Sequence, residues 1–453
     1  MLKHVARRTF IKQSLLASAY LPLVKNIGKL DGLKVEIVNP LCRVPVSFII
    51  DDSTALVNLA YFGIPQFGEV FPDQYPQDWR KLPREIPDSF VREFGEWCAQ
   101  HGVKGKYSMV PYPACTGWLH RNIPGWTNQQ LKESIALVRD FMQPNWDIHP
   151  EMISHTRVID LKTGLPYPYP TADYMENWEW SQTKSADELG NYIAYALNIL
   201  KEAGLFCEGV TTPGGFGSRN KVNLALGTLQ AVQDIYKSNL AHFFRDVITT
   251  PGESVEPVLY HASGLQGPHP QVSVHIIGCT DDWFGGWDGL ERGHADHFIT
   301  PDLQKGRMVE VIEAGEPAIM VCHWPGIYFS GKKTGFKIFK TVVERLHQKY
   351  DHLLWMKNSE IARYWAAKKL TEINVSGESV ALYAPFATEK FTVEINKPIS
   401  AASLVHQDQT STLKMTSGRN NLQEGLFCVE GNKSFLSFPL KHGSSRLTLM
   451  GLE

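Results

Sequence analysis

The residues of this chain that are best suited to chemistry are carboxylates and histidines that follow short apolar stretches. Asp51 and Asp52 come directly after the apolar run 46–50. Two adjacent carboxylates at the end of a buried strand are costly unless they bind a cation or exchange a proton. The pair therefore indicates a metal or acid–base site, and the alternative is a helix N-cap followed by an acid in the first turn.

A second group of possible ligands lies about a hundred residues further along the chain. Glu151 and His155 are four residues apart, with His149 just before them. On one helical turn, Glu151 and His155 would share a face and reach the same cation. A single histidine is usually a structural residue, but three possible ligands so close together favour a metal site.

Two later segments can supply further roles. Asp282 and Trp283 follow an apolar stretch, and an acid beside a tryptophan is suited to holding a sugar or orienting another group. A solvated turn over an apolar plug is the alternative. His323 and Trp324 follow another apolar stretch, where a histidine can act as a general acid or be a satisfied core residue.

A glycine-rich loop stands at 212–217, after another apolar stretch. It lacks the Gly-Lys-Ser/Thr of a phosphate cradle, so it is interpreted as a rigid wall of the site. Arg219 follows this loop and either reaches the site or caps local structure.

Apolar runs alternate with amphipathic stretches from residue 44 to 367. This alternation predicts an α/β fold with parallel strands and helical crossovers. The length fits a distorted (β/α) barrel of about seven or eight strands, with its site on the loops after the strands. An open doubly wound sheet is the alternative, although no Gly-x-Gly-x-x-Gly follows the first strand. Strands are expected at 46–50, 106–110, 146–148, 206–211, 243–248, 272–277, 318–322 and 353–356.

The sequence divides into three parts: an export signal with its linker at 1–30, the barrel at 40–369 and an accessory domain at 370–453. In the last part, short alternating runs separated by Gly, Asn, Ser and Pro predict a small β-sandwich, for packing or for sugar binding. The segment 61–84, rich in Pro, Phe and Asp, is expected to be a long functional or disordered insertion.

The N-terminus contains Arg7-Arg8-Thr9-Phe10-Ile11-Lys12 and then a weakly apolar stretch. It resembles a twin-arginine export signal, so we expect the bacterial export machinery as a partner and a periplasmic or extracellular location. An amphipathic first helix is the alternative.

The 453 residues carry a net charge of -2, which gives no basic field for nucleic acid. No run of ~18 apolar residues predicts stable membrane insertion.

The order of these motifs resembles the polysaccharide-deacetylase-like, metal-dependent carbohydrate esterases, over about residues 44–367. Asp51-Asp52 is similar to the first motif of that family, and Glu151-x-x-x-His155 to the second, with Glu in place of the first His. The segment 321–323 is similar to the last motif. Segments 212–214 and 282–283 are looser matches, and the first of these lacks the usual Arg.

The resemblance implies a hydrolase that removes an acyl group, most plausibly acetyl, from a carbohydrate through metal-activated water. Asp52, Glu151 and His155 would hold a divalent cation, zinc or another transition metal. Asp51 would be the base and His323 the acid that protonates the leaving group. The extra carboxylate weakens the Lewis acidity of the metal, and His149 is an alternative ligand in place of Glu151.

The carbohydrate would be held by side chains near the strand ends, and a backbone N–H near Tyr112 could stabilise an oxyanion. Two other functions stay open. One is a metal-independent glycoside hydrolase that pairs Asp52 with Glu151 or Asp282, and the other is a non-catalytic carbohydrate-binding relic. The expected substrate-binding residues are Tyr112, Trp146, Arg219, Asp282, Trp283 and Trp324.

Overall fold

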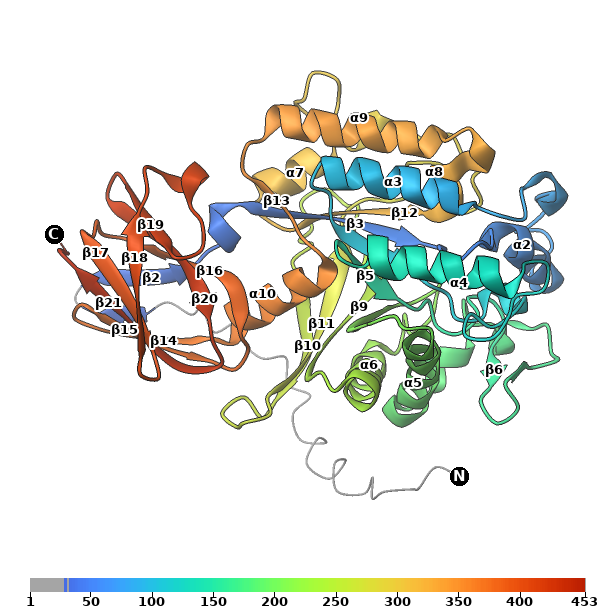
Figure 1. Ribbon diagram of the computed structural model, residues 1–453, viewed down its shortest axis with the longest axis horizontal. Helices are drawn as coiled ribbons and strands as arrows, with labels where there is room; N and C mark the ends of the chain where they lie inside the picture. The colour runs from blue at the N-terminus through green and yellow to red at the C-terminus, as the bar shows by residue number, and fades with distance from the viewer. Residues whose placement is uncertain (1–27, 31, 453) are drawn as a thin grey trace.

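The computed structural model describes residues 28–30 and 32–452 (Figure 1). The expected twin-arginine motif lies outside these residues, so export stays a prediction. In the described part of the chain, every helix is too short or too polar to span a membrane.

The predicted α/β fold with parallel strands is confirmed, and these strands form two hydrogen-bonded sheets. In the first sheet all neighbouring strands are parallel. Its strands are β3 (Val44–Asp51), β4 (Gly105–Ser108), β5 (Trp146–His149), β12 (Ala318–His323) and β13 (Leu353–Trp355). In the second sheet β10 runs antiparallel along one edge. Its strands are β8 (Gly209–Thr211), β9 (Leu240–Val247), β10 (Val258–Ser263) and β11 (Gln271–Gly278).

Backbone hydrogen bonds join these two sheets at two places. Thr211 N donates to Pro150 O over 3.0 Å, beside β5 and β8. Cys279 N donates to Ile319 O over 2.8 Å, between β11 and β12. The carboxyl ends of β3, β5, β8 and β12 therefore lie close together, which is where the chemically interesting residues follow the strands.

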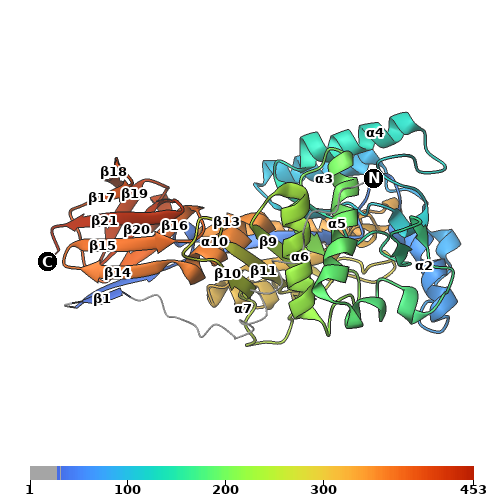
Figure 2. The ribbon, with the colours of Figure 1, turned by 90° about the horizontal axis from the view of Figure 1, so that it is seen from below.

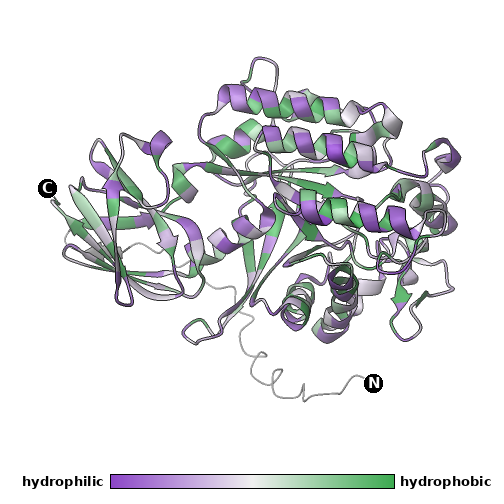
Figure 3. Cartoon of the chain, in the orientation of Figure 1, coloured by the Kyte–Doolittle hydropathy of each residue, from purple (hydrophilic) through white to green (hydrophobic). Residues whose placement is uncertain are grey.

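Helices cover the outside of the parallel strands (Figure 1). Helix α5 shows why: Ser185 and Glu188 form a capping box at its start, and Leu189, Ile193 and Leu200 bury one face at helical spacing. Figure 3 shows apolar residues on the central strands and hydrophilic ones on the outer helix faces. The helices are α2 (Leu59–Val70), α3 (Asp88–Gln100), α4 (Asn128–Leu137), α5 (Ala186–Glu202), α6 (Lys221–Tyr236), α7 (Arg307–Glu313), α8 (Trp324–Tyr328), α9 (Thr334–Lys349) and α10 (Asn358–Leu370).

The segment 61–84 is not the long loop that we expected, because most of its first half belongs to α2. Gly63 and Pro65 conceal the helix in the sequence. Ala60, Ile64 and Phe67, at spacings of four and three, turn buried side chains toward the interior.

The C-terminal region is rich in β-structure, as predicted. Its strands follow one continuous hydrogen-bonded path of ten strands, whose end strands β1 and β14 lie side by side (Figure 2). The expected two-sheet sandwich is therefore not established. This sheet also includes β1 and β2, which precede the parallel strands in sequence. In spatial order the strands are β1 (Gly28–Leu30), β2 (Leu33–Ile37), β16 (Thr388–Ile395), β20 (Lys433–Leu440), β19 (Leu426–Glu430), β18 (Gln409–Met415), β17 (Ala401–His406), β21 (Gly443–Met450), β15 (Ser379–Ala384) and β14 (Glu372–Ser376).

Candidate metal and acid–base site

The structure brings together the three predicted metal ligands. Asp52 Oδ1 lies 2.7 Å from His155 Nε2, and Glu151 Oε2 lies 3.6 Å from the same nitrogen. All three residues are buried, and each offers a ligand atom within 4.8 Å of the others. Apart from this contact with His155, the buried Asp52 Oδ1 has no hydrogen-bond partner. Two carboxylates and an imidazole that converge in this way fit a divalent transition metal with positions left for water.

The local backbone that carries the triad is not the helical turn that we expected. Asp52 has φ of 59° and His155 has φ of 68°, so both stand in the left-handed region. Such conformations cost about 1–3 kcal/mol each in non-glycine residues and concentrate at functional sites. Glu151 forms an isolated bridge with Thr211 instead of starting a helix. The turn, and not a helix face, therefore brings Glu151 and His155 together.

Glu151 is held rigidly by its neighbours. Asp52 N donates to both of its carboxylate oxygens, over 3.2 Å and 3.0 Å. Ser108 Oγ donates to Oε1 over 2.7 Å. The carboxylate is therefore oriented before any cation arrives, as a ligand group requires.

Lys106 is a site residue that sequence reasoning missed. Its side chain is completely buried, and its Nζ donates to Ile50 O over 3.0 Å, to Ser108 Oγ over 2.7 Å and to Asp51 Oδ1. The same Nζ lies 3.7 Å from Glu151 Oε1. Because strand side chains alternate, Lys106 and Ser108 share one face of β4. Two polar residues at this spacing in a buried strand are the signal that would have found it.

The proposed base and acid stand side by side. Asp51 and His323 are paired in register between β3 and β12. Burial raises the pKa of Asp51 to about 6, against the opposing effect of the Lys106 ammonium. Asp282 Oδ2 accepts hydrogen bonds from His323 N and, over 2.9 Å, from its Nδ1. Burial alone would lower the pKa of His323, but Asp282 and the charges of Asp52 and Asp51 raise it to about 10.

Behind His155 lies Glu176, a second residue that the sequence did not reveal. It accepts backbone N–H groups from Ile153, Ser154 and His155, and the Tyr192 hydroxyl donates to it over 2.5 Å. Burial raises the pKa of Glu176 to about 7, although these donors oppose the shift. Glu176 thereby holds the turn that carries His155. No motif marks it, because its partners lie 16 to 23 residues away.

The two charged ligands influence each other. Burial alone would lower the pKa of His155, but the negative charge of Asp52 raises it to about 9. Burial likewise opposes ionisation of Asp52, but His155 lowers its pKa below the usual value. The metal-free site is thus stabilised by an imidazolium–carboxylate pair, and a cation would displace the imidazole proton.

His149, the suggested alternative ligand, belongs to a different cluster. Its Nε2 lies 2.9 Å from His242 Nε2, and Asp147 stands close to His242. Asp147 also accepts hydrogen bonds from the N–H and hydroxyl of Ser359 at the start of α10. Since the imidazole of His149 faces His242, the structure does not bring it to Asp52 and His155.

Three of the six predicted carbohydrate contacts are already engaged with other parts of the protein. Trp146 and Trp324 are buried in the core, packed against Phe94, so their faces are closed to a sugar ring. Tyr112 is half-buried and stacks on Trp118 with ring centroids 4.0 Å apart. Its backbone N–H donates to Ile153 O over 2.8 Å and is already engaged.

Two more of the predicted contacts, Arg219 and Trp283, lie nearer the surface. Arg219 is exposed, and its guanidinium pairs with Glu179 over 2.5 Å. Trp283 is half-buried and packs edge-on against Phe298 with ring centroids 5.1 Å apart. Neither contacts the triad, whereas Asp282, the residue before Trp283, supports His323.

An aromatic cluster that the sequence did not reveal adjoins the triad. The Phe67 ring lies 6.3 Å from the His155 ring, and the half-buried rings of Tyr75, Trp178 and Trp287 surround Phe67 at 5.2, 5.6 and 5.9 Å. These rings come from three separate segments of the chain. Only folding brings them together, although the richness in Trp was visible in the composition.

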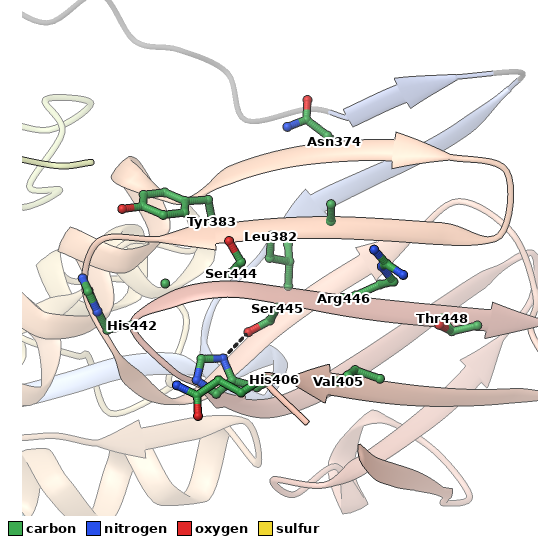
Figure 4. A pocket seen from close by; sticks show the side chains of 13 residues that line it. Asn374, Leu382, Tyr383, Val405, His406, His442, Ser444, Ser445, Arg446 and Thr448 are labelled. Carbon is green, nitrogen blue, oxygen red and sulfur yellow. Dashed lines mark hydrogen bonds between the residues drawn. The ribbon is translucent and has the colours of Figure 1, made fainter. Parts of the chain in front are cut away.

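A groove of about 950 Å³ lies on the C-terminal sheet (Figure 4). It contains Arg446, Tyr383 and His406, and His406 Nδ1 lies 3.0 Å from Ser445 Oγ. None of the predicted site residues lines it. The groove is therefore separate from the triad.

A scan against protein-family models and a search of curated proteins find no match. Among solved structures, the chain is similar to a "probable Polysaccharide deacetylase from Pseudomonas aeruginosa PAO1" (12% identity, 71% of this chain and 91% of the other, TM-score 0.36). It is also similar to Puue allantoinase (11%, 72% and 91%, 0.37). A third is the catalytic domain of GH30 xylanase C from Talaromyces cellulolyticus (9%, 92% and 99%, 0.28). TM-scores this low decide neither fold family nor activity.

Proposed function

We propose that this protein is a metal-dependent hydrolase that removes an acetyl group from a carbohydrate. The observation that carries the proposal is the buried triad of Asp52, Glu151 and His155, flanked by a carboxylate and a histidine at the ends of adjacent strands. In this proposal the two groups of parallel strands form one distorted barrel, with the triad at the carboxyl ends of its strands.

Each residue around the triad has a distinct role in this mechanism. Asp51, held by Lys106, accepts the proton of the attacking water. His323 carries a proton because Asp282 stabilises its charged form, and Nε2 can donate it to the leaving amine or alcohol. The base and the acid thus differ in charge because their environments differ.

The triad would hold a divalent cation, zinc before other transition metals, since an imidazole and carboxylates are ligands that zinc accepts. When bound, such a cation polarises the acyl carbonyl and makes water more acidic. Asp52 and His155 supply the ligands, and Glu151 is positioned by Ser108 as a third.

The carbohydrate would lie against the aromatic cluster next to His155. Half-buried Trp178 and Trp287 offer apolar faces of the kind on which sugar rings pack. An exported enzyme would meet such a substrate at the cell surface, which agrees with the twin-arginine signal expected at the N-terminus.

The test combines metal analysis with an assay for released acetate. Purified protein is compared with a Glu151→Ala/His155→Ala double variant and with His352→Ala, which replaces a half-buried histidine outside the site. Acetylated xylan and chitin oligomers serve as O-acetyl and N-acetyl probes. We expect one equivalent of zinc and acetate release in the wild type and in His352→Ala, and neither in the double variant.

Chelation separates this proposal from its competitors. Removal of the metal should abolish acetate release, and added zinc should restore it. Sugar release that survives chelation would instead favour a glycoside hydrolase. Carbohydrate binding without any turnover would favour a non-catalytic protein.

A further inference from the structure

Negative charge is concentrated around the triad. Asp51, Asp52 and Glu151 place three carboxylates in one buried region, with exposures of 7%, 1% and 0%. A Glu in place of a His ligand adds one negative charge to the site and lowers the electrophilicity of a bound cation. Buried carboxylates without a compensating charge are also strongly destabilising.

The compensating charge is supplied by Lys106. Its ammonium pairs with Asp51, lies 3.7 Å from Glu151 Oε1 and shares Ser108 with that carboxylate. The side chain is completely buried, so water does not screen this charge. Every hydrogen-bond partner of Nζ in the described structure belongs to the wall of the site.

We infer that Lys106 is a charge-compensating and positioning residue of the metal site. Its positive charge offsets the negative charge of Glu151. The ligand set of two carboxylates and one histidine then has the same local charge as a set of one carboxylate and two histidines. Lys106 also orients the Asp51 carboxylate as the base. The inference rests on the proposed metal-dependent hydrolase and extends it to a residue outside the ligand set.

A purely structural lysine makes a different prediction. If Lys106 only filled space, its replacement would loosen the site and weaken metal binding. If it opposes the cation and competes for the carboxylates, its removal leaves uncompensated negative charge that a cation neutralises. Metal affinity should then increase while turnover falls, which a structural role would not produce.

The experiment measures the zinc dissociation constant of the full-length protein by competition with a chromogenic chelator. For Lys106→Met we expect zinc to bind about tenfold more tightly and acetate release to fall about a hundredfold, because the base loses its orientation. Lys104→Met is the matched control, since Lys104 stands one residue before β4 and pairs with Glu360 over 3.4 Å. It should change neither quantity.

A second pair of variants tests the link to Glu151. Glu151→Gln should weaken zinc binding, and Lys106→Met/Glu151→Gln should return the dissociation constant toward the wild-type value because both charges are removed together.

If Lys106→Met is too unstable when metal-free, Lys106→Gln replaces it, and the zinc-induced rise in Tm is compared with that of the wild type. We expect a larger rise in the variant.

Two outcomes have distinct meanings. If the wild type binds zinc but both Lys106 variants bind it equally well or more weakly, charge compensation is wrong and the proposed hydrolase stands. If the wild type binds no zinc and releases no acetate, the proposed function fails and this inference fails with it.

Discussion

The interior site and the groove on the C-terminal sheet are both polar. Charged side chains are buried and paired in the interior site, but exposed to water in the groove. In the interior, Lys106 and Glu151 are completely buried, and each has several charged or hydrogen-bonding partners. In the groove, Arg446 and His442 are exposed, and Arg446 has no ion-pair partner among the described residues. Water stabilises the charge of Arg446, whereas the interior charges depend entirely on their neighbours.

This difference distinguishes the interior site, whose charged side chains are held in place by their neighbours, from the groove, which is an ordinary polar surface. Burying a charge costs several kcal/mol unless partners are placed with good geometry, so the interior charges depend on where their neighbours stand. An exposed Arg on a sheet requires no such partners. The interior residues should therefore tolerate substitution poorly, and the groove residues should tolerate it well.

The largest expected effect is on turnover. Asp51→Asn keeps the size of the side chain but removes the proton acceptor, so acetate release should fall about 10²–10⁴-fold. At saturating zinc, the amount of bound zinc should not change. A loss of zinc together with activity would make Asp51 a ligand, and Arg446→Ala in the groove should leave release unchanged.

The next effect is on stability. Glu176→Ala leaves the N–H groups of Ile153, Ser154 and His155 and the Tyr192 hydroxyl without their acceptor. At about 1–3 kcal/mol for each of these four unsatisfied buried donors, the free energy of unfolding should fall by at least about 4 kcal/mol. Urea unfolding measures it, with the exposed Glu179→Ala as control. Equal losses in the two variants would contradict the assigned role.

A third effect is on pH dependence. Burial lowers the pKa of His242 to about 4, so its folded form stays neutral where the unfolded form, at 6.5, takes up a proton. The unfolded state binds more protons between these values, so the free energy of unfolding falls as pH drops from 6.5 to 4. Urea unfolding across this range should show the slope. His242→Gln should reduce it, and His406→Gln in the groove should not.

The smallest effect belongs to the groove. Arg446→Ala removes an exposed side chain without an ion-pair partner, so the free energy of unfolding should change by less than about 0.5 kcal/mol. Urea unfolding under the conditions of the Glu176 experiment gives a direct comparison. A loss of several kcal/mol would mean that the groove, too, depends on placed charges.

Local sequence patterns predicted much of the framework. The apolar run before Asp51 is β3, because a strand buried on both faces leaves a nearly continuous apolar run. Helix α5 is buried on one face, and this leaves an amphipathic spacing in the sequence. The helix α2 was missed, since Gly63 and Pro65 disturb its pattern. The spacing of Glu151 and His155 predicts a helical turn, but spacing alone does not reveal a left-handed backbone.

The sequence by itself determined which residues could do chemistry at strand ends: Asp51, Asp52, Glu151, His155 and His323. Tertiary structure alone decided their partners. Lys106 meets Asp51 across 55 residues, and Asp282 meets His323 across 41. It also turned His149 toward His242 and away from the triad. The reason is physical: strand alternation sets which face a side chain takes, but register between distant strands sets what it touches.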